Sequence, residues 1–396
     1  MGGLSMEWKE VDIEQTSIEI IDGDRGKNYP KNNELTNSGY CLFLSAANVT
    51  KNGLQFSNNS FITKEKDALL RKGKLMPQDI VLTTRGTVGN VGFYSDDVPY
   101  PNMRINSGMV IIRPGEDFDT MFLYQYLRSC YFRAQITQFQ SGSAQPQLPI
   151  STLQKMKVIK PDIAAQHRIA SILSSLDRKI ELNNKINADL EEMAQAIFKN
   201  WLSECSDDVT IGELSLNITN YEKTDAEEVV LINSSDVTEG YFDHHNYSPN
   251  KNLKGHFKKR FQKGDILYSQ VRPRNRHWAY CNFDANDYLA STQLMVIRNN
   301  PSLITSILLY QYIISDNVWK EFTLKTETRS GTFPQGNYED LSQIRVPYNS
   351  DVEGISNQLE TLYAKMFMLE KENSRLSLLR DTLLPLLISG ELEVPE

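Results

Sequence analysis

The chain has 396 residues, of which 40% are hydrophobic and 23% are charged, and its formal net charge is −8. This length suits two domains, and the composition excludes a disordered or fibrous chain. The four cysteines are scattered and no run of about 20 apolar residues occurs. We therefore expect no disulfide framework, no zinc site, no membrane span and a cytoplasmic location.

The first 160 residues are predicted to form a compact mixed α/β domain. Short β-rich runs at 80–84 and 108–113 are separated by Gly, Pro and Asn, and one helix is expected near 121–132. Loop 23–30 is the favoured DNA-contacting loop, while loop 141–147 offers hydroxyls and amides for DNA or is simply a structured turn. The candidate DNA contacts here are Arg25, Lys27, Asn28, Tyr29, Arg85, Thr87, Ser143 and Gln145.

Residues 161–205 carry a heptad repeat, which predicts a long coiled-coil helix. Apolar residues recur every seven positions and are interleaved by a second series four positions later. About 35 helical residues make a rod of roughly 50–60 Å, longer than one domain needs for its own core. The predicted seam positions are Ile169, Leu173, Leu176, Ile180, Asn183 and Asn187.

Residues 206–350 repeat the pattern of the first domain at an offset of 185 to 188 residues. Segment 48–53 corresponds to 236–240, and segment 107–113 corresponds to 292–298. Leu-Tyr-Gln-Tyr occurs in both halves, ending at Tyr126 and at Tyr312. Such a run of correspondences is improbable by chance, so a second domain of the same fold is predicted.

A strongly basic stretch distinguishes this second domain. Between Lys251 and Arg276 there are nine Lys or Arg residues and a single acidic residue, Asp265. Arginines in a Pro- and Asn-containing loop can reach guanine edges or phosphates, although a solvated basic surface remains the alternative. The candidate DNA contacts in this domain are Lys258, Lys259, Arg272, Arg274, Arg276, Thr332 and Gln335.

Residues 351–396 repeat the heptad pattern and predict a second long helix, whose end Pro385 is expected to perturb. Antiparallel pairing of the two helices would bring seam asparagines near the middle of each. These asparagines either set the register of the pair or bind water. The predicted seam positions are Leu362, Met366, Leu369, Asn373 and Leu376.

The sequence offers little support for an active site within this chain. None of the five histidines has a triad setting. Asp162, Asp177 and Lys179 resemble the acidic pair and lysine of a metal-dependent nuclease, but the latter two lie on the heptad helix, where positions i and i+2 do not converge. A nuclease or methyltransferase is one rival interpretation, and a coiled-coil interaction scaffold that does not bind nucleic acid is another.

Several segments resemble a known family, the DNA-specificity (S) subunits of Type I restriction-modification systems. Residues 161–202 and 379–392 look like the helical spacer regions of that family. Residues 85–92 and 104–109 look like one class of its target-recognition domains, and the second domain is a more divergent match.

The resemblance implies a fold of two pseudo-repeated target-recognition domains, 1–160 and 206–350, separated by spacer helices 161–205 and 351–396 that form an antiparallel coiled coil. Each domain would read one half of a split double-stranded DNA target in the major groove. The helices would set the spacing and bind two modification (adenine-N6 methyltransferase) subunits, which restriction subunits join.

The resemblance also implies that this chain is non-catalytic and binds no cofactor or metal itself. S-adenosylmethionine, ATP and Mg²⁺ are expected in the partner subunits. Because the net charge is −8, we expect the isolated chain to bind DNA weakly and the modification subunits to supply much of the phosphate contact.

Overall fold

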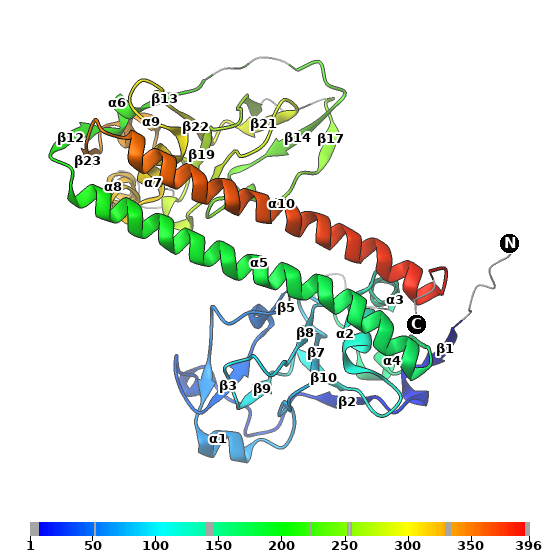
Figure 1. The fold of residues 1–396 in the computed structure, drawn as a ribbon. Helices are drawn as coiled ribbons and strands as arrows, with labels where there is room; N and C mark the ends of the chain where they lie inside the picture. The colour runs from blue at the N-terminus through cyan, green and yellow to red at the C-terminus, as the bar shows by residue number, and fades with distance from the viewer. Residues whose placement is uncertain are drawn as a thin grey trace, which may run out of the picture. The chain divides into compact units, whose positions relative to one another are not determined.

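The computed structural model describes residues 8–50, 53–139, 146–219, 221, 224–251, 253, 256–328 and 334–392. Its chain divides into two units: unit 1 comprises Met1–Glu181 and Glu372–Glu396, and unit 2 comprises Leu182–Lys371. Two long helices, α5 (Ile163–Ser203) and α10 (Glu353–Ser389), each contribute one half to either unit (Figure 1). Within each unit a globular module packs on its portion of these helices.

The module of unit 1 contains an antiparallel sheet with the strand order β2-β10-β7-β8. Its two central strands are apolar except for their last residues, Thr83 and Arg113, because both faces are covered. Ile80 and Ile112 pack toward the core that includes α2, and Val81 and Ile111 pack toward the β3–β9 pair. The strands of the whole module are β1 (Lys9–Asp12), β2 (Glu19–Asp22), β3 (Cys41–Leu44), β4 (Val49–Thr50), β5 (Gly53–Leu54), β6 (Phe61–Ile62), β7 (Ile80–Thr83), β8 (Val91–Phe93), β9 (Met103–Ile105), β10 (Met109–Arg113) and β11 (Lys157–Lys160). Its helices are α1 (Lys64–Leu69), α2 (Thr120–Arg128), α3 (Cys130–Phe139) and α4 (Ile150–Leu153).

The module of unit 2 has the same topology. The sheet β13-β22-β19-β20 corresponds strand for strand to that of unit 1, and the parallel pair β14–β21 corresponds to β3–β9. The internal repeat inferred from the sequence is therefore a repeat of fold. The strands of the unit 2 module are β12 (Asp207–Thr210), β13 (Ser215–Asn217), β14 (Glu228–Ile232), β15 (Val237–Thr238), β16 (Tyr241–Phe242), β17 (Tyr247–Pro249), β18 (Phe257–Lys259), β19 (Ile266–Ser269), β20 (Trp278–Tyr280), β21 (Tyr288–Ser291), β22 (Leu294–Asn299) and β23 (Arg345–Tyr348). Its helices are α6 (Ile211–Leu214), α7 (Ser306–Ile314), α8 (Asp316–Glu327) and α9 (Tyr338–Ser342).

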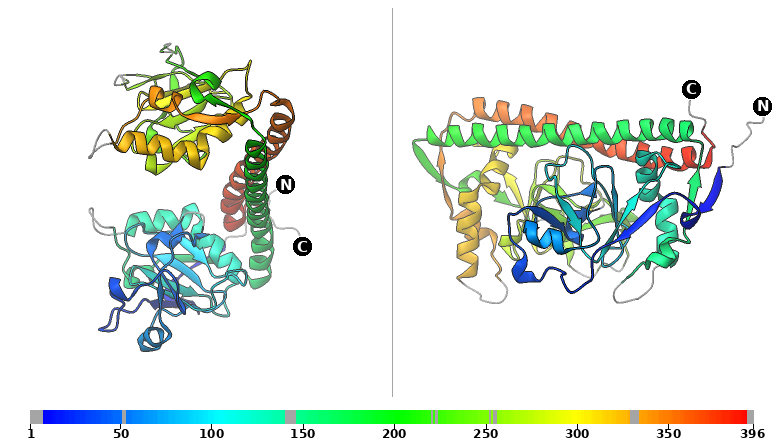
Figure 2. Two further views of the ribbon diagram at one scale, coloured as in Figure 1. Left: turned by 90° about the vertical axis from the view of Figure 1, so that its left-hand side faces the viewer. Right: turned by 90° about the horizontal axis from the view of Figure 1, so that it is seen from below.

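One helix was predicted near 121–132, and the structure has two, α2 and α3, which meet at Ser129. The Ser129 hydroxyl accepts a hydrogen bond from the Phe132 amide (3.2 Å) and so caps the start of α3. Unit 2 has the same break at Ser315, whose hydroxyl accepts from the Val318 amide (3.5 Å). In the right-hand view of Figure 2, α3 and α8 lead away from the long helices.

In unit 1 the first part of α5 runs antiparallel to the last part of α10. Asp177 of α5 accepts a hydrogen bond from Arg380 Nη1 of α10 (2.7 Å), and Lys179 lies 3.4 Å from Glu372. Asp177 also accepts from two side chains of α2, Gln125 Nε2 (2.5 Å) and Arg128 Nη1 (3.0 Å). This carboxylate thus joins the module to both helices. The predicted seam positions of this unit are buried (Ile169, Leu173) or partly buried (Leu176, Ile180, Asn373, Leu376).

Unit 2 contains the other antiparallel portion of the helix pair. The buried Asn187 donates from Nδ2 to the Met366 carbonyl (3.4 Å), so this seam asparagine bonds the partner helix directly. Gln311 of α7 donates to the Tyr363 hydroxyl (2.5 Å), where unit 1 uses Gln125 and Asp177 at the corresponding positions of the repeat. The predicted seam positions of this unit are buried (Asn183, Asn187, Met366, Leu369) or partly buried (Leu362).

Pro385 was expected to perturb the end of the second helix, yet α10 continues through it to Ser389. Proline removes only one backbone donor near the helix end. The buried Leu384, Leu387 and Ile388 pack into the core of unit 1 and hold this last turn.

Two carboxylates of unit 2 lie where α5, α10 and the module meet. Glu370 accepts a hydrogen bond from Asn282 Nδ2 (3.3 Å). Burial raises the pKa of Glu370 to about 7, and the negative charge of Glu191 adds to the increase. Burial likewise raises the pKa of Glu191, with a further contribution from the charge of Glu239.

We expect Glu370→Gln to stabilise unit 2 by about 1–2 kcal/mol at pH 8 and to have little effect below pH 5. A carboxyl whose pKa is raised in the folded state favours folding while it is protonated. Wild-type stability should therefore fall as pH rises from the ordinary pKa of 4.5 through about 7. Urea denaturation at both pH values measures the difference, with the exposed Glu192→Gln as the control. An equal change in unfolding free energy at both pH values would contradict a raised pKa of Glu370.

Candidate nucleic-acid interface

In unit 1 three loop segments lie side by side at one end of the central sheet. The amides of Thr84 and Arg85 donate to the Gly108 carbonyl (2.8 and 3.1 Å), and the Leu148 amide donates to the Thr84 carbonyl (2.9 Å). Arg85 also forms a β-bridge with Gln147. We call residues 84–87, 106–108 and 147–148 the unit 1 platform.

Unit 2 repeats this arrangement. The Gln270 amide donates to the Gln293 carbonyl (2.9 Å), and the Gly336 amide donates to the Gln270 carbonyl (2.9 Å). Val271 forms a β-bridge with Gln335. Residues 270–276, 292–293 and 335–336 are the unit 2 platform. The two platforms share a backbone frame and differ in their side chains.

Three of the predicted contacts gather at the unit 1 platform. Arg85 and Thr87 are exposed on the loop after β7. Arg25 is also exposed. It lies beside the platform, because its Nη2 donates to the carbonyl of the platform residue Ser107 (3.3 Å) and to Asp22 Oδ1 (3.1 Å). Two arginines and a hydroxyl thus face solvent at one place, an arrangement suited to phosphates or base edges.

The rest of loop 23–30 is largely engaged within unit 1. Asn28 Nδ2 donates to the Leu69 carbonyl (3.2 Å), and the Tyr29 ring packs edge-on against Phe43 at 5.7 Å. The loop is braced by Asp24, because backbone amides that donate to its carboxylate, led by Gly26, lower its pKa. Lys27 is exposed. Asn28 and Tyr29 therefore have structural partners within unit 1 in addition to their partial exposure.

In unit 2 the arginine loop is fixed by the helix beside it. Arg274 pairs with Glu327 of α8 (Nη2 to Oε2, 2.6 Å), and Arg276 lies 3.3 Å from Asp316. The Arg276 guanidinium also lies over the Trp319 ring, 4.3 Å from its centroid, a cation–π contact. Arg274 and Arg276 thus hold the loop in place, and Arg272 is exposed on the platform.

Two of these arginines adopt backbone angles that favour glycine. The φ angle is 48° at Arg272 and 53° at Arg276, whereas the corresponding positions in unit 1 are Gly86 (75°) and Gly89 (93°). A non-glycine residue in this region costs roughly 1–2 kcal/mol. Glycine would adopt these backbone angles without that cost. The retention of arginine therefore suggests that its side chain has a function.

The two lysines of the predicted basic surface lie in different environments. Lys258 is exposed on β18, but Lys259 is buried, and its ammonium donates to the carbonyls of Leu294 (2.6 Å) and Thr292 (3.3 Å). Burial lowers the pKa of Lys259. We therefore leave Lys259 out of the DNA contacts, because its ammonium supports the turn before β22 from inside.

The remaining predictions concern the loops after α3 and α8. Ser143, Gln145 and Thr332 lie outside the described residues. Gln335 is exposed on the unit 2 platform. Sequence reasoning missed Gln147 and Gln293, which are exposed on the two platforms. The β-bridges identify Gln147 as the counterpart of Gln335, and a stricter alignment of the two halves could have found this pair.

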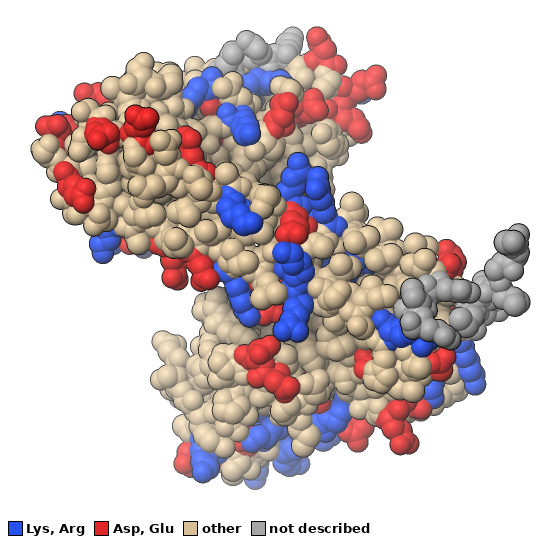
Figure 3. Space-filling view, viewed as in Figure 1, with Lys and Arg blue, Asp and Glu red and all other residues tan. Residues whose placement is uncertain are grey.

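Basic and acidic side chains are interspersed on the face drawn in Figure 3.

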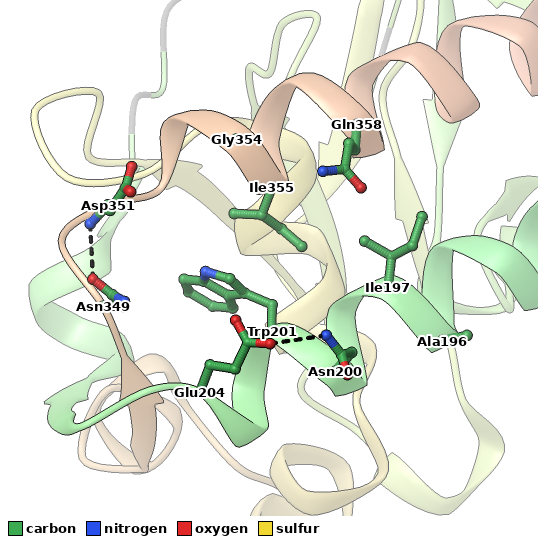
Figure 4. Close-up of a pocket in the computed structure, with 10 residues that line it drawn as sticks. All are labelled: Ala196, Ile197, Asn200, Trp201, Glu204, Asn349, Asp351, Gly354, Ile355 and Gln358. Carbon is green, nitrogen blue, oxygen red and sulfur yellow. Dashed lines mark hydrogen bonds between the residues drawn. The ribbon is translucent and has the colours of Figure 1, made fainter.

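A cavity of about 530 Å³ lies in unit 2 between the end of α5 and the start of α10 (Figure 4). Trp201, Ile197 and Ile355 form its apolar part, and its ten lining residues include no His, Cys or Ser for nucleophilic catalysis. Over the described part of the chain, no three His, Cys, Asp or Glu side chains are placed to hold a metal ion. Among the same residues no helix could cross a membrane.

Residues 7–192 match a family described as the Type I restriction modification DNA specificity domain. The Type I restriction enzyme HindI specificity subunit of Haemophilus influenzae is 36% identical over 136 residues, which are 34% of this chain and 30% of that protein. The MjaIX specificity subunit of Methanocaldococcus jannaschii is 23% identical, covering 80% of this chain and 78% of that protein. A solved Type I restriction-modification S subunit from M. genitalium aligns with a TM-score of 0.58 at 16% identity, over 100% of this chain and 98% of that one.

These matches confirm the resemblance to Type I specificity subunits that the helical segments indicated. The match to the Haemophilus subunit covers only 30% of that protein's length. The solved structure bears on the fold alone. It confirms the predicted fold class, a mixed α/β chain with two repeated globular modules and two long, antiparallel helices.

Proposed function

We propose that this chain is the non-catalytic DNA-specificity subunit of a Type I restriction-modification complex, acting in the cytoplasm. Each module reads one half of a split double-stranded target in the major groove. The observation that carries the proposal is the pair of platforms, which share one backbone frame and the equivalent glutamines Gln147 and Gln335. Their other exposed side chains differ: Arg85 in unit 1, and Arg272 and Gln293 in unit 2. A repeated frame with different side chains suits two different half-targets.

The proposed division is 1–160 and 206–350 for the target-recognition domains and 161–205 and 351–396 for the spacer helices. Element boundaries support it, since β11 ends at Lys160 and α5 begins at Ile163, while β23 ends at Tyr348 and α10 begins at Glu353. The helices are proposed to fix the gap between the two half-targets.

The long helices are proposed to bind two modification subunits, through which restriction subunits join. Leu182 and Met193 of α5 are 48% and 51% exposed, and their counterparts in the repeat, Met368 and Leu379 of α10, are 54% and 46% exposed. Eleven residues make about three helical turns, so each pair lies on one face of its helix. Two equivalent apolar faces suit two copies of one partner.

We expect Leu182→Asp with Met193→Asp to remove one modification subunit from the complex, and Met368→Asp with Leu379→Asp to remove one as well. A charge placed in an apolar contact loses its hydration without gaining a partner. Native mass spectrometry of the co-expressed complex counts the copies. The control is Leu324→Asp, which changes an exposed leucine of α8. Two bound copies in either double variant would contradict this part of the proposal.

The cofactors follow from this division of labour. The modification subunits would hold S-adenosylmethionine and transfer its methyl group to adenine N6. ATP and Mg²⁺ would serve the restriction subunits. The part of this chain is to select the DNA sequence and position the partners on it.

DNA contact by the arginine loop is tested by comparing two neighbouring arginines in the assembled complex. We expect Arg272→Gly to lower affinity for the selected target about tenfold, because it removes an exposed platform guanidinium and leaves a residue suited to the left-handed backbone. Arg274→Ala should cost no more than about threefold, because Glu327 already pairs with that side chain. Fluorescence anisotropy at fixed salt measures both. Equal losses would argue against base contact by Arg272.

A further inference from the structure

Gln293 stands out on the unit 2 platform as a residue for which the fold has no evident need. It lies exposed in the turn between β21 and β22. Its backbone carbonyl accepts from the Gln270 amide (2.9 Å), which is one of the contacts that join the segments of the platform. Any residue could supply that carbonyl, so this backbone contact does not explain why the position is a glutamine.

The corresponding residue of unit 1 is Gly108, whose carbonyl accepts the equivalent hydrogen bond from Thr84 (2.8 Å). Unit 1 therefore has no side chain where unit 2 has an exposed amide. A Cβ atom at Gly108 would lie 3.2 Å from Asn106 Oδ1. The backbone role is common to both halves, and the amide belongs to one half only.

The amide of Gln293 is partly oriented by the protein. Ser234, in the loop after β14, donates from its hydroxyl to Gln293 Oε1 (3.4 Å). This contact is long for an O–H···O hydrogen bond, so it favours one orientation of the amide without fixing it. A glutamine amide also has a second lone pair on Oε1 and two Nε2 hydrogens with which it can contact a base.

We propose that Gln293 is a specificity-determining residue that reads an adenine in the half-target of unit 2. The inference rests on the proposed function. A glutamine amide pairs with adenine in the major groove through two hydrogen bonds: its oxygen accepts from N6 and its nitrogen donates to N7. Ser234 is a positioning residue that presents the amide in the orientation required. Unit 1, with Gly108 at this place, reads its half-target without such a contact.

The test uses the full chain co-expressed with its modification subunits and selects bound duplexes from a random pool. Gln293→Gly should lower discrimination at one adenine of one half-target by about 5- to 100-fold and leave the other half-target unchanged. Glycine preserves the frame, as Gly108 does in unit 1. The matched control is Gln262→Ala, an exposed glutamine that precedes β19 at the opposite end of that strand.

A second variant of nearly the same volume keeps the test independent of folding. Gln293→Glu keeps the acceptor oxygen and replaces the donating Nε2 by a second acceptor, so preference at that position should shift from adenine toward cytosine, whose N4 group donates. A split target whose base preferences are unchanged in both variants would overturn the role of Gln293 and leave the proposed function standing. A wild-type complex that recovers no split target would overturn both.

Discussion

Replacing Asp265 with alanine is expected to lower the unfolding free energy of unit 2 by about 3–4 kcal/mol. Its buried carboxylate accepts two hydrogen bonds from Arg298, at Nε (2.6 Å) and Nη2 (2.8 Å), and a third from the Gln262 amide (2.8 Å). Without the carboxylate, a half-buried guanidinium and a backbone amide lose their partner. Arg298 retains some contact with solvent. The expected loss of unfolding free energy is therefore near the lower end of the range for breaking a buried ion pair.

The same arrangement in unit 1 provides a matched variant. Asp79 accepts from Arg113 Nε (2.8 Å) and Nη2 (2.9 Å) and from the Met76 amide (2.7 Å). Asp79→Ala should therefore cost unit 1 about as much as Asp265→Ala costs unit 2. Glu19, which is exposed and 3.6 Å from Arg113, is the control, and Glu19→Ala should cost less than about 1 kcal/mol.

Hydrogen exchange with mass spectrometry assigns each loss to a unit. The expected result is faster exchange in the sheet β2-β10-β7-β8 for Asp79→Ala, and in the sheet β13-β22-β19-β20 for Asp265→Ala. Destabilisation of less than about 1 kcal/mol in either variant would show that the duplicated ion pair is not a main support of the modules.

The second large effect is expected at the junction of module and helices in unit 1. Asp177→Ala should lower the unfolding free energy by about 2–3 kcal/mol, because Arg128, Arg380 and Gln125 all donate to this one carboxylate. The control is Asp381, which accepts hydrogen bonds from Nε and Nη2 of Arg380 (3.0 and 2.9 Å). The Asp381 side chain is 65% exposed, whereas that of Asp177 is 24% exposed. Asp381→Ala should therefore cost less than about 1 kcal/mol.

The effect of Asp177 should also depend on pH. Burial by itself would raise the pKa of Asp177, but Arg128, Gln125 and Arg380 outweigh it and the pKa is lowered. A carboxyl with a lowered pKa stabilises the fold above its unfolded pKa, and this contribution is lost as pH falls through the folded value. The difference between wild type and Asp177→Ala should thus be full at pH 7 and shrink in strong acid. Thermal unfolding at several pH values measures it, and a gap that stays constant would exclude the ionised carboxylate as its cause.

The repeat and the long helices could be predicted from sequence because both are periodic. A correspondence at 185 to 188 residues and apolar positions every seven residues need no knowledge of tertiary contacts. The break at Ser129 was missed because a single serine inside an apolar helical pattern does not by itself reveal that its hydroxyl caps a new helix.

The individual site residues were harder to predict, since charge in a sequence does not distinguish a surface group from an internal partner. Lys259 lies in the same basic run as Lys258, yet it is buried and bonds two carbonyls. Gln293 escaped notice because its importance comes from its neighbours Gln270 and Ser234, which are distant along the chain. Only the fold brings these segments to one surface.

The most direct test of the account is selection from random duplexes by the chain assembled with its modification subunits. We expect one enriched motif made of two short, different sequences separated by a gap of fixed length. Each half should respond to changes in one platform only: Arg85 and Gln147 for one half, Arg272 and Gln293 for the other. An ungapped motif, or binding without sequence preference, would contradict the proposal that the two modules read a split target.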